Sequence, residues 1–128
     1  MSRQVVLALH KECIATFGGS DGVRDEDLLD SALARPESLF CYGVPTLYEL
    51  AAAYGYGLAK NHPFIDGNKR TAFLTSAVFL MDNGFQPLVN EAEVASAVTA
   101  LAAGQLTETE FAQWLTQSFK TAKQTPSK

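Results

Sequence analysis

Basic side chains are unevenly distributed along the chain. Between residues 37 and 118 the only lysines and arginines are Lys60, Lys69 and Arg70, on either side of His62. Such a cluster is typical of a site that binds an anion. The alternative is that all three are ordinary solvated charges, with Lys60 as the last-turn cation of a helix.

The run HPFIDGNKR, residues 62–70, predicts a short loop that leads into a helix. A helix N-terminus exposes unpaired N–H groups and a partial positive charge, and both favour an anion. Gly67 has no side chain to keep an anion from those groups. Lys69 and Arg70 in the first turn oppose the helix dipole by about 0.3–1 kcal/mol each, a cost that a bound anion would reverse. The run therefore predicts a phosphate site.

Three other residues of the run have candidate roles. Asp66 precedes the helix, so its carboxylate is either the N-cap or a ligand of Mg²⁺ on a nucleotide. His62 is the candidate proton acceptor beside a phosphate, because histidine commonly acts as a general base, although many loop histidines have no such role. Phe64 is expected to be buried and to anchor the loop so that His62 points outward.

Other chemistries have little support in the sequence. His10 and Cys13 share a helix face, but a zinc site would also need Cys41 and His62 to converge, at no recognised spacing. The glycines at 18, 19 and 22 lack the Lys and Ser/Thr of a phosphate-binding P-loop. Cys13 and Cys41 are expected to be free thiols in a reducing compartment.

Apolar periodicity and capping signals predict about six helices. Their sequences cover residues 3–17, 25–35, 46–60, 71–81, 91–103 and 107–119. Pro36 is expected to end the second helix, and residues 36–45 are the best candidate for a small hairpin or flap. Residues 71–81 are apolar around nearly the whole circumference, which predicts a central helix. The expected fold is an all-α, single-domain bundle of about six helices around a buried central helix, over residues 1–119, followed by a polar tail, 120–128.

Composition agrees with one globular domain. The chain has 128 residues, of which 47% are hydrophobic, and a formal net charge of −4. A negative net charge makes direct binding of nucleic acid unfavourable. No uninterrupted apolar stretch reaches membrane-spanning length, and the first residues do not resemble a signal peptide. The chain is therefore expected to be cytoplasmic.

With these residues in view, the chain resembles the Fic/Doc superfamily, and the Doc (death-on-curing) toxins more than the Fic adenylyltransferases. HPFIDGNKR matches the Doc pattern His-x-Phe-x-Asp-(Gly/Ala)-Asn-Lys-Arg, and FGGSDGVRDEDLLDSALARP resembles the upstream block. The resemblance extends over about residues 7–119. Lys69 stands where the Fic motif has its second Gly, and Phe73 where it has its second Arg.

The resemblance implies the toxin component of a toxin-antitoxin system, which transfers the γ-phosphate of ATP to a Ser or Thr hydroxyl and so arrests translation. The family's known target is elongation factor Tu. By position, the resemblance implies that His62 is the general base and that Asp66 holds Mg²⁺ or orients the phosphate. It implies that Gly67 and Asn68 donate hydrogen bonds to the phosphates. Lys69 and Arg70 would neutralise charge on the transferred group, and Lys60 would be a further phosphate contact.

The resemblance also bears on regulation. The inhibitory Ser/Thr-x-x-x-Glu-(Gly/Asn) motif of some Fic enzymes is absent from this sequence. Control by a separate Phd-type antitoxin, bound as a helix in a groove, is therefore expected. Two alternatives stay open: transfer of AMP to a protein hydroxyl by the same site, and a helical binding module without catalysis.

Overall fold

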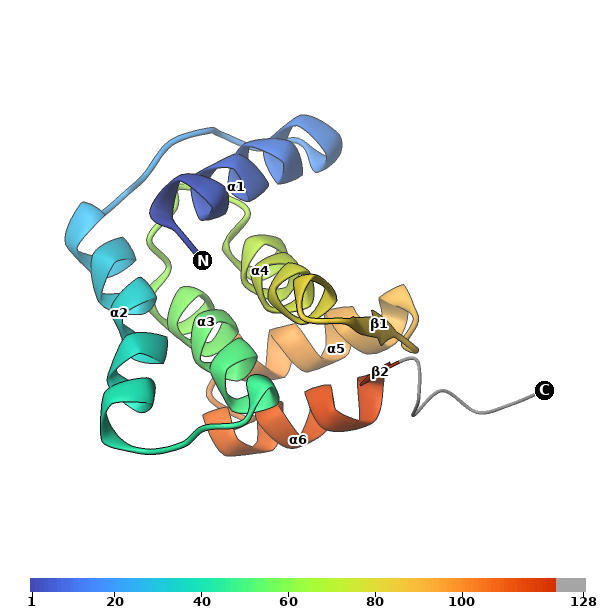
Figure 1. Ribbon diagram of the computed structural model, residues 1–128. Helices are drawn as coiled ribbons and strands as arrows, with labels where there is room; N and C mark the ends of the chain where they lie inside the picture. Colours follow the sequence, from blue (N-terminus) through green and yellow to red (C-terminus); the bar gives the residue numbers. More distant parts are fainter. Residues whose placement is uncertain (122–128) are drawn as a thin grey trace.

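The computed structural model describes residues 1–121 and is mostly helical (Figure 1). Its elements in chain order are α1 (Arg3–Phe17), α2 (Glu26–Tyr42), α3 (Leu47–Asn61), α4 (Asn68–Asp82), β1 (Phe85–Pro87), α5 (Glu91–Ala102), α6 (Glu108–Ser118) and β2 (Phe119–Thr121). The predicted all-α bundle of six helices is confirmed. No helix of the described part is long and apolar enough to cross a membrane.

The helices begin where local capping signals place them. Asp25 caps α2 by accepting a hydrogen bond from the Leu28 N–H. Three reciprocal capping boxes open α3, α5 and α6, formed by Thr46 with Glu49, Asn90 with Glu93, and Thr107 with Glu110. Each box satisfies two N–H groups that a helix N-terminus would otherwise leave unpaired.

Helix α3 lies at the centre of the bundle, in contact with α2, α4, α5 and α6 (Figure 1). Small residues let its neighbours approach closely: a Cβ on Gly55 would lie 2.4 Å from the Ser76 Oγ and 2.7 Å from Phe111. The helix predicted as central, α4, shares this position, because it contacts α1, α3 and α5. The buried central helix of the prediction is therefore a packed pair, α3 and α4.

The prediction for residues 36–45 was wrong. Pro36 does not end α2 but lies buried inside it, and the helix continues to Tyr42, so no hairpin forms there. Proline cannot donate to the carbonyl four residues earlier, which belongs to Ala32. That carbonyl faces Gly57 of α3, where an added Cβ would lie 3.1 Å from the Ala32 oxygen. Close packing on α3 therefore maintains the helix across the proline.

The strands lie elsewhere in the chain. Residues 85–87 pair antiparallel with 119–121, with Gln86 opposite Lys120. Strand β2 thus continues the folded part to Thr121, two residues beyond the predicted domain boundary at 119. The rest of the predicted polar tail, 122–128, lies outside the described residues.

Candidate functional site

The loop between α3 and α4 begins at His62, in a left-handed conformation. His62 has φ 49°, and it is the only residue other than glycine with a positive φ in the described part of the chain. The Arg24 guanidinium donates two hydrogen bonds to the His62 carbonyl, at 2.8 and 2.6 Å, and one to the Asn61 carbonyl at 3.0 Å. These bonds cap the end of α3 and hold the backbone of His62, while its side chain is exposed.

The α1–α2 connection runs antiparallel beside this loop. The Arg24 N–H donates to the Pro63 carbonyl at 2.7 Å, and the Ile65 N–H donates to the Gly22 carbonyl at 3.1 Å. Val23 and Phe64 form an isolated bridge between the two segments. The loop is therefore fixed by a segment about forty positions earlier in the chain.

Phe64 is buried and anchors the loop in the core, with 1% of its surface exposed. The Asn68 side chain closes the loop, since it accepts a hydrogen bond from the Phe64 N–H and donates one to the Phe64 carbonyl, each at 2.9 Å. Asn68 was assigned a phosphate-donor role by resemblance. Both polar groups of its side chain are engaged within the loop, so its backbone N–H is the group left for a phosphate.

Helix α4 begins without a side-chain cap. Gly67 is its N-cap residue at φ 79°, and the first backbone N–H bonded across the helix start is that of Thr71, which donates to the Gly67 carbonyl. The N–H groups before Thr71 are available to an anion. The predicted reason for glycine needs correction, because a Cβ on Gly67 would point at Ile14 and His10 rather than over these groups. The left-handed φ and this close packing require glycine.

Asp66 is not the N-cap of α4, because Gly67 occupies that position, so the N-cap alternative for Asp66 is excluded. Its Oδ2 instead accepts a hydrogen bond from the Ser20 N–H at 2.7 Å. Its Oδ1 has no hydrogen-bond partner within residues 1–121. One carboxylate oxygen beside an uncapped helix start fits Mg²⁺ carried by a nucleotide, since Mg²⁺ takes one or two carboxylates together with phosphate oxygens. No group of three potential ligand side chains gathers in the described region.

Two of the three predicted cations lie at the helix start. Neither Lys69 nor Arg70 forms an ion pair with another described residue. The Arg70 guanidinium lies 3.7 Å from the centre of the Phe17 ring, a cation–π contact that orients it. Lys60 is different, because its ammonium lies beside Gly104 at the end of α5.

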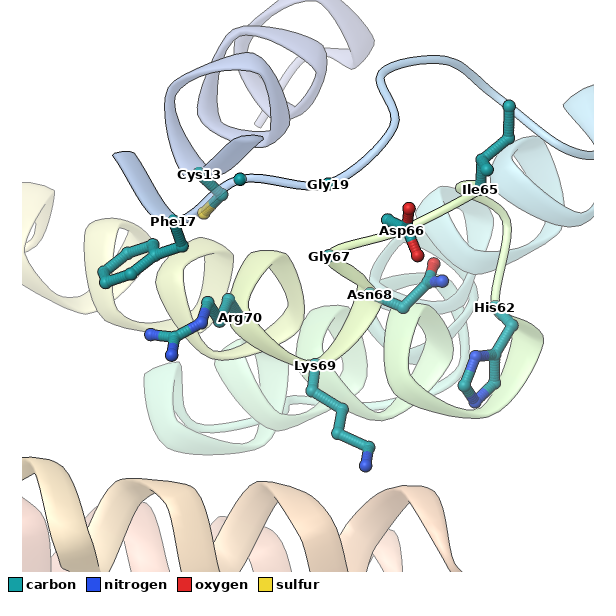
Figure 2. Close-up of a pocket in the computed structure, with 11 residues that line it drawn as sticks. Cys13, Phe17, Gly19, His62, Ile65, Asp66, Gly67, Asn68, Lys69 and Arg70 are labelled. Atoms are coloured by element: carbon teal, nitrogen blue, oxygen red, sulfur yellow. The ribbon is translucent and has the colours of Figure 1, made fainter. Parts of the chain in front are cut away.

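The α3–α4 loop, the start of α4 and the end of α1 surround an open cavity of about 630 Å³ (Figure 2). It is lined by Cys13, Phe17, Gly18, Gly19, His62, Ile65, Asp66, Gly67, Asn68, Lys69 and Arg70. The structure thus brings together the predicted site residues except Lys60 and the buried anchor Phe64. His62 and Arg70 lie on opposite sides of the start of α4, with Lys69 between them (Figure 2). An anion at this position would have the Arg70 guanidinium on one side and the His62 imidazole on the other, with the Lys69 side chain between them.

Sequence reasoning missed the residues that hold the loop from outside the motif. Among them are His10, Phe17, Ser20 and Arg24, all from α1 or the connection after it. One signal was available. Val6, His10 and Cys13 share the buried face of α1, and a histidine on such a face needs a hydrogen-bond partner.

Comparison with known proteins agrees with this geometry. The Fic/DOC family model matches residues 1–80. The chain is 51% identical over 73 residues to a protein named Toxin Doc from Mycolicibacterium smegmatis, a match that spans 55% of each chain. It is 29% identical over 124 residues to Protein kinase doc of Escherichia phage P1, covering 96% of this chain and 98% of the phage protein. Since the family match contains every residue that lines the cavity, the chain belongs to the Fic/DOC family.

Proposed function

We propose that this protein is a toxin that transfers the γ-phosphate of ATP to a Ser or Thr hydroxyl of a target protein. The observation that carries the proposal is the start of α4. Within residues 1–121, Lys69 and Arg70 have no ion-pair partner there and no side chain caps the helix. This arrangement opposes the helix dipole unless an anion binds there. The two curated relatives, one named a toxin and the other a protein kinase, also support this proposal.

The chemistry assigned to these residues is mostly electrostatic. Negative charge spreads over the transferred phosphoryl group, and Lys69, Arg70 and the N–H groups of α4 would stabilise it. Asp66 would hold Mg²⁺, which neutralises charge on the phosphate oxygens when bound. The Arg70 guanidinium is already oriented by Phe17, so little ordering is required when the phosphate arrives.

His62 would act as the general base. Its exposed imidazole takes the proton from the target hydroxyl, whose oxygen forms a bond to the γ-phosphorus as the bond to the leaving ADP breaks. The His62 backbone is held by Arg24, so the ring emerges from a fixed point at the rim of the cavity. A target side chain can reach it there because the cavity is open.

Adenylyl transfer is the second candidate, and the surroundings of α4 argue against it. Lys69 fills the position where the Fic motif has a glycine, which changes how closely a phosphate can approach the backbone. Phe73, in place of the second arginine, packs against Trp114 and Phe119 instead of lining the cavity. One guanidinium clamp on a triphosphate is therefore missing.

The proposal extends to partners. By resemblance the target is elongation factor Tu, and the regulator is a Phd-type antitoxin bound as an amphipathic helix. Large apolar side chains are exposed around the end of α2, including Phe40, Tyr42 and Val44. Clustered exposed apolar side chains mark protein interaction sites, which supports a protein regulator.

The decisive experiment uses ATP labelled at either the α or the γ phosphorus. The purified protein is incubated with a bacterial lysate, and His62→Asn is run in parallel to subtract lysate kinases. A His62-dependent band with γ label alone, near the size of elongation factor Tu, supports the proposal. A band with α label would establish adenylyl transfer instead, and no His62-dependent band would favour a binding module without catalysis.

A further inference from the structure

His10 is a buried polar residue that the proposed mechanism does not use. It lies on α1 with 2% of its surface exposed, and its Nε2 is 2.8 Å from the Asp66 carbonyl oxygen. A carbonyl oxygen can only accept a hydrogen bond, so Nε2 carries a proton and donates it. The ring therefore bonds directly to the loop that forms the cavity, 56 positions away in the sequence.

The same ring packs under two other residues of the loop. It stacks on Phe64 with the ring centres 3.8 Å apart and the planes within 7°. Its Cδ2 and Nε2 lie 3.6 and 3.7 Å from the position that a Cβ on Gly67 would take. On its other side, Nδ1 faces the Asp21 carboxylate at 3.7 Å. His10 thus supports the loop from the side of the buried core.

The geometry of the peptide bond gives this contact a consequence. The Asp66 carbonyl and the Gly67 N–H belong to one planar trans peptide, in which C=O and N–H point in opposite directions. Because His10 holds the carbonyl on the core side, the Gly67 N–H is directed away from His10. Gly67 lines the cavity, and its N–H makes no hydrogen bond within residues 1–121.

We propose that His10 is a positioning residue that fixes the Asp66–Gly67 peptide so that the Gly67 N–H meets a phosphate oxygen. The ligand it prepares for is the phosphate chain of a nucleotide, so this inference rests on the proposed function. The Nε2–H donor has the central role, and the stacking on Phe64 keeps the ring at the correct angle.

Two substitutions separate the donor from the ring. His10→Phe keeps an aromatic ring against Phe64 but removes the donor, whereas His10→Gln keeps an N–H at the same number of bonds from the backbone. Tyr48→Phe is the matched control, because it also keeps a ring and loses a hydrogen bond to a backbone carbonyl, that of Phe119, far from the cavity. If His10→Phe does not fold, His10→Leu takes its place.

The measurements are the Kd for Mg·ATP and the amide signal of Gly67 in a nitrogen-15 NMR spectrum. His10→Phe is expected to weaken binding by about tenfold and to abolish the change of the Gly67 signal on adding Mg·ATP. His10→Gln should recover most of the affinity, and Tyr48→Phe should bind as the wild type does. Wild-type binding by His10→Phe, equal loss in His10→Gln, or equal loss in Tyr48→Phe would each overturn the inference.

Failure of the proposed function would look different. If the wild type binds no Mg·ATP, the nucleotide site is wrong, and the role of His10 is then decided on the ligand-free proteins. Loss of the donor should shift the Gly67 amide signal in His10→Phe but not in Tyr48→Phe. An unchanged Gly67 signal would show that His10 does not orient this peptide.

Discussion

The backbone and the side chain of His62 place separate demands on position 62. In the proposed mechanism the side chain must be exposed to take a proton, and the backbone adopts a left-handed conformation that most residues avoid. Arg24 stabilises that conformation through the carbonyl, without touching the imidazole. A substitution that tests the imidazole must therefore tolerate the same backbone conformation.

Asparagine meets that condition, because it tolerates the left-handed region better than alanine does. We expect His62→Asn to abolish phosphate transfer while the melting temperature stays within about 2 °C of the wild type, as is usual for exposed positions. Transfer of γ label to the target and thermal denaturation are the two measurements. A large loss of stability with retained transfer would make His62 structural.

A second prediction concerns the cations at the start of α4. Mg·ATP at a hundred times its Kd should raise the unfolding free energy of the wild type by about 2.7 kcal/mol. The double variant Lys69→Gln/Arg70→Gln should show little of this increase when measured at the same nucleotide concentration. Lys60→Gln is the control, because its ammonium lies beside Gly104, outside the cavity, and it should respond like the wild type. An equal response of the double variant would place the nucleotide elsewhere.

At the scale of single residues, the site residues within the run 62–70 could be predicted from the sequence. The residues outside the run that hold it in place could not. Phe64, Asp66 and Arg70 are neighbours in the chain, so their chemistry is visible in one short run. His10 and Arg24 reach the loop from 56 and 38 positions away, and only the packing of α1 and of the α1–α2 connection against the loop reveals those contacts. That these residues are a histidine and an arginine does not indicate which backbone carbonyl each one would bond.

Among the elements, the predicted helix starts and ends lie within one residue of the observed ones, except at the start of α4 and the end of α2. Capping boxes are local, whereas the continuation of α2 through Pro36 depends on its contact with α3. The two short strands were missed for the same reason, since three residues are too few to show alternation and their partner is distant in sequence. Errors thus occurred where tertiary contacts decide the local structure.

The contact of α3 with α4 and α6 is tested by Gly55→Ala. Helix propensity alone favours alanine by about 1 kcal/mol. The added Cβ would overlap Ser76 and Phe111, and overpacking typically costs about 1–3 kcal/mol, so a net loss of stability is expected. Gly43→Ala is the control, because Gly43 has an extended φ and its nearest neighbour would be 3.9 Å away. Chemical denaturation of both variants decides between propensity and packing.

For the molecule as a whole, two tyrosines predict how stability changes with pH. Burial raises the pKa of Tyr54, with a smaller contribution from the Glu37 carboxylate, and burial also raises the pKa of Tyr48. The stability that these protonated groups contribute is complete below their ordinary pKa of about 10 and is lost as pH rises through the raised values.

The unfolding free energy of the wild type should therefore fall as pH rises above about 10. Tyr48→Phe/Tyr54→Phe should lose less over the same range, because phenylalanine does not titrate. Denaturant titrations at a series of alkaline pH values measure both. Parallel curves for the two proteins would assign the alkaline loss to other groups.

The order of the cavity residues along the chain has a consequence for synthesis on the ribosome. Every residue that lines the cavity lies between Cys13 and Arg70, so all of them are translated before α5 and α6. Yet α3, which ends at the cavity loop, packs against α6, where Phe111 contacts Gly55. A nascent or truncated chain that stops before α6 would hold the complete set of site residues without the support that keeps them in place. Since domains generally fold as units, the proposed toxic activity should arise only with release of the finished polypeptide.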